Sequence, residues 1–304
     1  MLVTIITPTL NRANFLAHAI ESVRRQSYRP IQHIIVDGGS TDGTLELLAR
    51  YPEVERIMGR DEGIYDALNK GLTLAKGEVI GFLNSDDLYL GDVVAAAVSR
   101  LRADPTLDAI CGGARIVSEG IEGRRELAYL NDEAVKSLNM QDISGPPCLI
   151  NGRFFRREVF KRIGKFDARF RIAGDQEFLF RACINQLKSI SLPGIVYEYR
   201  QHSGSMTLNG RKADRLSALR ECLDIAARFS SVEQMPAEVR RSCRRWHAWL
   251  SGWGTINAFM SGEMRRSTEL AALGMRRDPF WPILFSTQIG SYLKWTKARR
   301  PTPD

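Results

Sequence analysis

Residues 80–87 read Ile80-Gly81-Phe82-Leu83-Asn84-Ser85-Asp86-Asp87, a short apolar run that ends abruptly in two adjacent carboxylates. A run of this length is typical of a strand that is buried inside a parallel sheet. Ligands of such sheets bind just beyond the carboxyl ends of the strands. Two adjacent carboxylates tolerate each other best with a cation between them, and hard oxygen ligands suit Mg²⁺ or Mn²⁺. Asp86 and Asp87 are therefore candidate metal ligands, while a helix N-cap stays open as the alternative because Asp is a preferred cap.

On the N-terminal side of this run, strands and helices alternate along the chain. Apolar runs predict four strands, at residues 3–7, 31–36, 54–57 and 79–83. Amphipathic spacing predicts helices at 13–25, around 45–48 and at 64–72. This alternation predicts an α/β fold with a mostly parallel sheet and helices on both faces.

The pattern continues less regularly after this run and changes near residue 209. Further expected elements are strands within 108–129 and at 189–191 and 196–199, and helices over 157–163 and 176–185. Beyond residue 209 only helices are expected, including an apolar stripe formed by Trp246, Trp249, Leu250, Trp253 and Ile256. Such a stripe more often packs into a core than it binds a ligand. We predict two domains, residues 1–207 and an all-helical region 208–304.

The composition is that of a globular protein, with 304 residues of which 44% are hydrophobic and 26% are charged. A net charge of +8 favours anionic partners such as nucleotide phosphates, anionic lipid head groups or nucleic acid. The five cysteines are scattered without a Cys-x-x-Cys pair, which argues against a disulfide framework and against a zinc site. The sequence contains neither a secretory signal nor an apolar stretch of membrane-spanning length. These features predict a cytoplasmic protein with reduced thiols.

Three predicted strand ends carry polar residues that converge on one edge of the sheet. The first strand is followed by Thr7-Pro8-Thr9-Leu10-Asn11-Arg12, and the second ends in Asp37-Gly38-Gly39. A glycine-rich loop with an acid suits a nucleoside, because a carboxylate accepts hydrogen bonds from the base or the ribose. A tight turn capped by Asp37 is the alternative.

These motifs, taken in order, resemble the family 2 glycosyltransferases of the GT-A fold, a Rossmann-like fold. The matching segments are residues 7–12, 26–28, 34–44, 63–71, 82–87, 174–177 and 199–207. The resemblance implies inverting transfer of a sugar from a nucleotide-diphosphate donor, with UDP as the expected carrier. It also implies a glycan or lipid-linked acceptor, as in surface polysaccharide biosynthesis. The Gln-x-x-Arg-Trp signature of processive members is missing from the sequence, so we expect a non-processive, hexosyltransferase-type enzyme.

The resemblance also implies roles for individual residues. Nucleotide contacts are expected from Pro8, Asn11, Arg12, Asp37, Gly38, Asn84 and Ser85. Asp86 and Asp87 would hold a divalent cation, Mn²⁺ or Mg²⁺, although Asn84 replaces the first acid of the family's acid–x–acid motif. His202 would complete the metal site or close over the diphosphate.

The expected general base is Asp175, which matches the family acid that deprotonates the acceptor hydroxyl. Inverting displacement needs such a base and charge stabilisation for the leaving diphosphate. A carboxylate with a raised pKa can serve, but Asp175 also precedes an expected helix, so an N-cap stays open.

Lipid-linked acceptors would bring the enzyme to the cytoplasmic face of the membrane. Residues 279–285 are rich in aromatic and apolar side chains, and cations follow at 294–300, a mixture that suits an anionic membrane surface. A helix packed on the catalytic domain, with a solvated basic end, is the alternative.

Two other functions are considered. A sugar-phosphate nucleotidyltransferase would require a glycine-rich loop after the first strand, and residues 10–14 contain no glycine. A basic protein that binds nucleotides or nucleic acid would explain the charge, but strand-end acids repel phosphate in the absence of a metal. We therefore expect no nucleic-acid partner.

Overall fold

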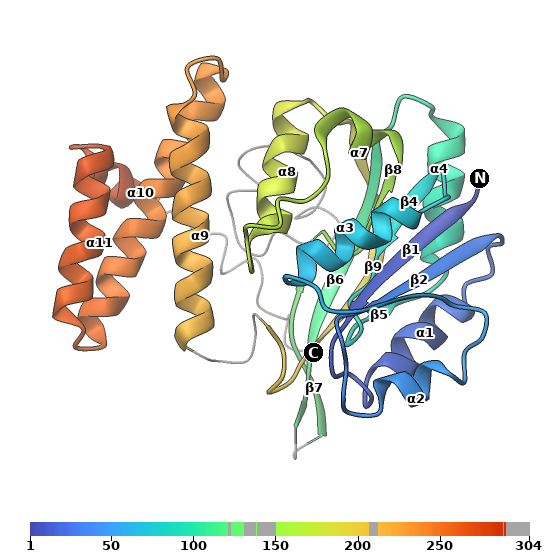
Figure 1. Cartoon of the computed structure of the whole chain (residues 1–304). Coiled ribbons are helices and arrows are strands. Elements are labelled where there is room, and N and C mark those ends of the chain that lie inside the picture. The colour runs from blue at the N-terminus through green and yellow to red at the C-terminus, as the bar shows by residue number, and fades with distance from the viewer. Residues whose placement is uncertain (121–122, 131–137, 139–149, 207–211, 288, 290–304) are drawn as a thin grey trace.

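A computed structural model describes residues 1–120, 123–130, 138, 150–206, 212–287 and 289 (Figure 1). Its N-terminal half is a parallel sheet with the strand order β3-β2-β1-β4. The strands are β1 (Val3–Thr9), β2 (Ile31–Asp37), β3 (Glu55–Met58) and β4 (Val79–Phe82). Thr9 lies opposite Asp37 in the register, and Ile6 lies opposite Phe82. The polar segments that follow β1, β2 and β4 therefore leave the sheet at one edge, as predicted.

The second half of the sheet is mixed. It contains β5 (Leu88–Tyr89), β6 (Ala109–Gly120), β7 (Gly123–Leu130), β8 (Arg153–Arg156) and β9 (Ser189–Gln201). β8 lies between β4 and β6 and runs antiparallel to both, whereas β6 and β9 are parallel. β5 is antiparallel to β9, and β7 to β6. The predicted parallel arrangement thus applies to β3-β2-β1-β4, and the insertion of β8 begins the mixed part.

Helices cover both faces of the sheet, as predicted. They are α1 (Leu16–Arg24), α2 (Thr44–Leu48), α3 (Ile64–Leu74), α4 (Val93–Ala103), α7 (Glu158–Ile163) and α8 (Gly174–Ile184). Successive side chains of a strand point to opposite faces, so Ile5 and Ile6 enter different cores. Ile6 packs in the core that contains residues of α3, α7 and α8, while Ile5 packs with residues of α1 and α4.

The C-terminal part is helical, as predicted, and lies beside α8 (Figure 1). It contains α9 (Lys212–Ser231), α10 (Ala237–Met260) and α11 (Met264–Arg277). Phe180 of α8 stacks on Phe229 of α9 and on Trp246 of α10, with ring centroids 5.7 and 5.0 Å apart. The helical part therefore shares a core with the α3–α7–α8 face of the sheet. The predicted boundary at 207/208 falls at residues outside the described ones and stays a prediction.

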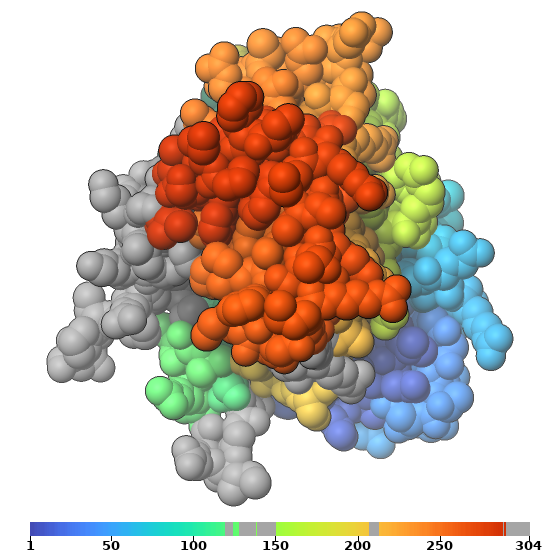
Figure 2. Space-filling model, turned by 90° about the vertical axis from the view of Figure 1, so that its left-hand side faces the viewer, coloured from blue at the N-terminus to red at the C-terminus, as the bar shows by residue number. Residues whose placement is uncertain are grey.

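The predicted tryptophan stripe is buried only in its first half. Trp246 and Trp249 are buried, whereas Trp253 and Ile256 are 44% and 42% exposed. The expectation that the stripe packs into a core therefore holds for Trp246 and Trp249 and does not hold for Trp253 and Ile256. Figure 2 shows the face of the molecule that α9, α10 and α11 form together.

Candidate functional site

A cavity of about 370 Å³ opens at the carboxyl ends of β1 and β4. The loops after these strands, the start of α3 and the end of β9 line it. Its lining residues are Pro8, Thr9, Leu10, Asn11, Arg12, Asp61, Gly63, Ile64, Ala67, Asn84, Ser85, Asp86, Tyr199 and Met206. The structure thus gathers Pro8, Asn11, Arg12, Asn84, Ser85 and Asp86 around one cavity.

The loop after β1 is tied to the loop after β2. The Ser40 hydroxyl accepts a hydrogen bond from the Asn11 amide at 2.8 Å, and the Asn11 side-chain oxygen accepts one from the Thr41 amide at 2.8 Å. Asn11 adopts a left-handed conformation with φ 53°, a region that asparagine tolerates better than most residues. These bonds fix the wall of the cavity that Asn11 and Arg12 form.

Asp37 forms the turn after β2. Its carboxylate accepts hydrogen bonds from the Gly39 and Ser40 amides at 2.9 Å each and from the Ser40 hydroxyl at 2.6 Å. Asp37 is buried, and neither it nor Gly38 lines the cavity. These contacts match the alternative of a tight turn capped by Asp37. A hydrogen bond to a nucleobase would have to use a lone pair of the Asp37 carboxylate that the Gly39 and Ser40 donors do not occupy.

Asp61 is a cavity residue that the sequence analysis did not identify. Its carboxylate lies against Gly38, where an added Cβ would come 2.5 Å from Asp61 Oδ2. Burial is the largest influence that raises the pKa of Asp61. The available signal was the Asp-x-Gly segment 61–63 directly before an expected helix.

Asp86 is the charged centre of the cavity. Its Oδ2 lies 3.0 Å from His202 Nε2 and 3.4 Å from Arg12 Nε. Burial alone would raise the pKa of Asp86, but the hydrogen bond from His202 and the positive charge of Arg12 outweigh it and hold the pKa below its usual value. Asp86 is therefore ionised at neutral pH.

His202 is held in one tautomer. Its Nδ1 accepts a hydrogen bond from the Gly204 amide at 3.1 Å, so we assign the ring proton to Nε2, which donates to Asp86. The ring stacks on Phe15 with centroids 4.2 Å apart. A metal at Nε2 would require a proton on Nδ1, where Gly204 already donates. With its proton on Nε2, His202 suits the predicted role of closing over the diphosphate. The same tautomer does not suit the predicted role as a metal ligand.

Asp87 makes different contacts from those of the adjacent Asp86. It is fully buried, and its carboxyl oxygens face the Tyr197 hydroxyl at 2.6 Å, the Arg200 amide at 2.9 Å and the Asn84 side-chain amide at 3.0 Å. Burial and then the charge of Asp86 raise its pKa well above the ordinary value. The prediction that Asp87 shares a metal does not fit these contacts, because protein donors surround its carboxyl group.

A divalent cation fits this site through Asp86. Among the described residues, no group of three or more His, Cys, Asp and Glu side chains is arranged to hold a metal ion. Mg²⁺ is commonly bound through one or two carboxylates together with substrate phosphates and water. One ionised carboxylate at the edge of a cavity meets that requirement, provided that a diphosphate supplies the remaining ligands.

Asp175 is the second residue of α8. Its Oδ1 accepts a hydrogen bond from the Gln176 amide at 2.8 Å and lies 3.2 Å from the Tyr65 hydroxyl. Tyr65 follows Ile64, which lines the cavity. Burial is the largest influence and raises the pKa of Asp175 to about 6. A carboxylate of this basicity can accept a proton near neutral pH.

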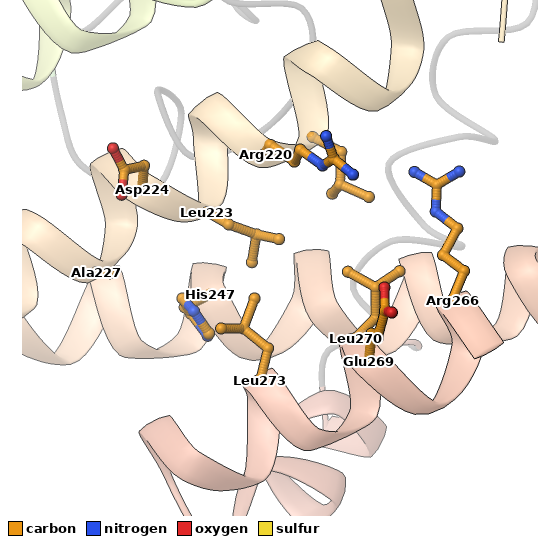
Figure 3. Close-up of a pocket in the computed structure, with 10 residues that line it drawn as sticks. Arg220, Leu223, Asp224, Ala227, His247, Arg266, Glu269, Leu270 and Leu273 are labelled. Carbon is orange, nitrogen blue, oxygen red and sulfur yellow. The ribbon is translucent and has the colours of Figure 1, made fainter. Parts of the chain in front are cut away.

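A second cavity, of about 300 Å³, lies among the C-terminal helices (Figure 3). Leu219, Leu223 and Leu270 contribute to its apolar lining, together with the buried ring of His247. Burial and then the charge of Arg277 lower the pKa of His247 to about 4. None of the predicted site residues lines this cavity.

The sequence matches a family model and several known proteins. A family model described as glycosyl transferase family 2 matches residues 4–164. A PGL/p-HBAD biosynthesis glycosyltransferase of Mycobacterium bovis is 30% identical over 208 residues, which are 66% of this chain and 77% of that protein.

Two solved glycosyltransferases share the fold. S. aureus TarS 1–349, in complex with UDP-GlcNAc, is similar with a TM-score of 0.66 and 18% identity, over 93% of this chain and 86% of that one. The full TarS chain is longer, and this chain spans 42% of it. The mannosyltransferase PcManGT from Pyrobaculum calidifontis, in complex with GDP-Man and Mn²⁺, has a TM-score of 0.59 and 20% identity, over 94% and 86% of the two chains. These similarities show the GT-A fold.

Proposed function

This chain belongs to glycosyl transferase family 2, and from that premise we propose that it transfers a sugar, with inversion, from a nucleotide-diphosphate donor to a hydroxyl group. The observation that carries the proposal is that two carboxylates, Asp86 and Asp175, differ in pKa and in position. Asp86 is an ionised carboxylate of the cavity lining, and Asp175 is a more basic carboxylate that contacts Tyr65, the residue next to the cavity-lining Ile64. Family membership disfavours a nucleotidyltransferase and a nucleic-acid-binding protein.

The donor would occupy the cavity at the ends of β1 and β4. We assign Pro8 and Asp37 to the base, and the remaining nucleotide contacts to Asn11, Arg12, Gly38, Asn84 and Ser85. UDP is the expected carrier, which TarS 1–349 binds in its complexes with UDP-GlcNAc and UDP, whereas PcManGT binds GDP-Man.

The leaving diphosphate would lie against Asp86, Arg12 and His202. Asp86 would hold a divalent cation, Mn²⁺ or Mg²⁺, which when bound offsets the negative charge that grows on the diphosphate. Arg12 would donate to phosphate oxygens on the same side. The Nε2 proton of His202 would also donate to a phosphate oxygen, in place of its hydrogen bond to Asp86 once that carboxylate holds the cation. Asp87 would keep the Asp86 loop in position through Tyr197 and Arg200.

Asp175 would act as the general base. The acceptor oxygen forms a bond to the anomeric carbon while the bond from that carbon to the diphosphate breaks. The bonding pair leaves with the diphosphate, and the hydroxyl proton passes to Asp175. With a pKa of about 6, Asp175 is mostly ionised at neutral pH and remains basic enough to take that proton.

We further propose that the protein binds a membrane surface, where a lipid-linked acceptor would lie. In the described part of the chain, no helix has both the length and the apolar character needed to cross a bilayer. The end of α10 and the segment after α11 nevertheless expose large apolar side chains, with Met260 79% and Phe280 68% exposed. With the net charge of +8, this supports peripheral binding to an anionic membrane at its cytoplasmic face. We propose a glycan or lipid-linked acceptor of surface polysaccharide biosynthesis and a non-processive, hexosyltransferase-type reaction.

The proposal is tested by the thermal stability of the protein with UDP, GDP, dTDP and CDP, each with and without Mn²⁺. A ligand that binds only the folded state raises the melting temperature by mass action. We expect one nucleoside diphosphate to stabilise the protein, and only with Mn²⁺. Absence of a shift with all four would contradict the donor site.

A further inference from the structure

The loop before α8 is anchored by a carboxylate from the C-terminal helices. Glu221 of α9 accepts hydrogen bonds from three consecutive backbone amides. Its Oε1 lies 3.1 Å from Arg171 N, and its Oε2 lies 2.8 Å from Ile172 N and 2.7 Å from Ala173 N. Asp175 follows two residues after the last of these amides. The segment that carries the proposed base is thus held by a residue of the C-terminal helical region.

We propose that Glu221 is a positioning residue for Asp175, through which the C-terminal helical region sets the geometry of the proposed transfer reaction. This inference rests on the proposed function. It assigns the helical region a role in the reaction itself, in addition to any role in localisation.

The anchored segment has little room to adjust. The carbonyl oxygen of Ile172 accepts a hydrogen bond from the Tyr65 hydroxyl at 2.6 Å, and the same hydroxyl lies 3.2 Å from Asp175 Oδ1. A Cβ added to Gly174 would come 2.7 Å from the Tyr65 ring. A shift of the 171–173 backbone would therefore change the Tyr65–Asp175 contact as well. Small misplacements of a reacting group are costly, and about 1 Å can reduce a rate about a hundredfold.

The anchor is one of several contacts between α9 and this segment. Arg171 also pairs with Asp214 of α9 at 3.8 Å, and the Ser217 hydroxyl lies 3.5 Å from Glu221 Oε1. The stacking of Phe180 on Phe229 and Trp246 keeps α8 against the helical region independently of Glu221. Loss of Glu221 alone should therefore leave the helices packed and release mainly the 171–173 backbone.

Glu221 also contributes to the electrostatic surroundings of the base. The titratable groups that face Asp175 are Tyr65 from α3 and Glu221 from α9. On α8 itself, Glu177 is paired with Arg181 at 2.9 Å and lies 3.7 Å from Arg228 of α9. Burial is the main influence that raises the pKa of Asp175, and the negative charge of Glu221 adds to it. Removal of that charge should move the acid limb of kcat to lower pH.

The test compares Glu221→Ala and Glu221→Gln in the full chain with Asp224→Asn, an exposed acid on the same helix. Hydrogen exchange of the Ile172 and Ala173 amides, the Kd for the stabilising nucleoside diphosphate with Mn²⁺, and kcat with its sugar donor are measured. We expect faster exchange of these amides in Glu221→Ala, kcat lower by about ten- to a hundredfold, and an unchanged nucleotide Kd. Glu221→Gln keeps one acceptor oxygen and should lie between wild type and Glu221→Ala, with its acid limb displaced to lower pH. Asp224→Asn should resemble wild type.

Each other outcome has a defined meaning. Wild-type kcat in both Glu221 variants would overturn this inference and leave the proposed function standing. An equal loss of kcat and nucleotide affinity would show general disruption of the domain and would also overturn it. If Glu221→Ala does not fold, Glu221→Gln decides the question with the same measurements. A wild-type protein that neither binds a nucleoside diphosphate nor transfers a sugar would overturn the proposed function, and this inference with it.

Discussion

The Nε2 proton of His202 points at Oδ2 of Asp86 across 3.0 Å, while the Gly204 amide occupies the other ring nitrogen. The imidazole is thus fixed as a donor beside the ionised carboxylate of Asp86. This relationship separates the roles of the two residues, since Asp86 can bind a cation and His202 can donate to an anion.

The first prediction concerns His202→Ala. A hydrogen bond to a charged group contributes roughly 1.5–3 kcal/mol, so the nucleoside diphosphate should bind about ten- to a hundredfold more weakly. Because His202 is a donor and not a ligand, binding should still require Mn²⁺. Calorimetric titration with and without Mn²⁺ measures both effects. Binding that no longer depends on Mn²⁺ in this variant would show that His202 ligates the metal.

A second prediction concerns Asp87, whose carboxyl group is surrounded by the Tyr197 hydroxyl, the Arg200 amide and the Asn84 side chain. Replacement by alanine leaves these buried donors without their acceptor, which costs about 1–3 kcal/mol for each unsatisfied group. Asp87→Ala should therefore lower the free energy of unfolding by at least about 2 kcal/mol. Urea denaturation measures this loss, and Glu233→Ala, at an exposed acid between α9 and α10, is the control. A fully stable Asp87→Ala protein would argue against the structural role.

The third prediction is a pH dependence. Asp175 must be ionised to accept a proton, and its pKa is raised to about 6, so kcat should fall as the pH drops through about 6. The hydrogen bond from Tyr65 opposes the effect of burial and lowers the pKa. Tyr65→Phe should therefore move the acid limb to higher pH. A limb that stays in place would show that another group titrates.

The fourth prediction concerns Asp61 and Gly38. A methyl group at position 38 would come 2.5 Å from Asp61 Oδ2, so Gly38→Ala must displace the Asp61 carboxylate. If Asp61 contacts the nucleoside, Gly38→Ala and Asp61→Ala should weaken binding by similar factors, and the double variant should add little to either. Nucleotide titrations of the three variants measure the coupling. Fully additive losses would mean that Gly38 acts independently of Asp61.

The fifth prediction addresses the membrane surface. Replacing Phe259, Met260 and Phe280 by serine removes exposed apolar side chains and leaves the net charge unchanged. Co-sedimentation with anionic liposomes should decrease, because peripheral binding combines apolar insertion with electrostatic attraction. Leu74→Ser, at an exposed apolar position in α3, is the control. Equal sedimentation of the triple variant and the wild type would count against this surface.

The sequence predicted the parallel half of the sheet because local patterns determine it. Each strand of β3-β2-β1-β4 is one short apolar run, and each connection carries a recognisable helix signal. β8 follows a segment with little periodicity, and its place between β4 and β6 depends on pairing with residues far away in the chain. The segment that precedes β8, residues 131–149 apart from 138, lies outside the described residues.

The location of the site residues was easier to predict from the sequence than the chemical role of each residue. Asp86 and Asp87 look equivalent in the sequence, and β9 makes them different by placing Tyr197 and Arg200 around Asp87 and leading into His202. Tyr65 and Glu221 were missed for a related reason, because their contacts join separate segments of the chain. Asp61 was missed although the Asp-x-Gly segment 61–63 gave a local signal.

The most direct test of the account is the release of nucleoside diphosphate from a sugar donor by the wild type, Asp86→Asn and Asp175→Asn, measured beside nucleotide binding. We predict that Asp86→Asn loses metal-dependent binding and turnover together. Asp175→Asn should bind the nucleotide with wild-type affinity and lose transfer by about a hundredfold or more, which is the usual contribution of a general base. Wild-type transfer by Asp175→Asn, or metal-dependent binding by Asp86→Asn, would contradict the division between the donor carboxylate and the base.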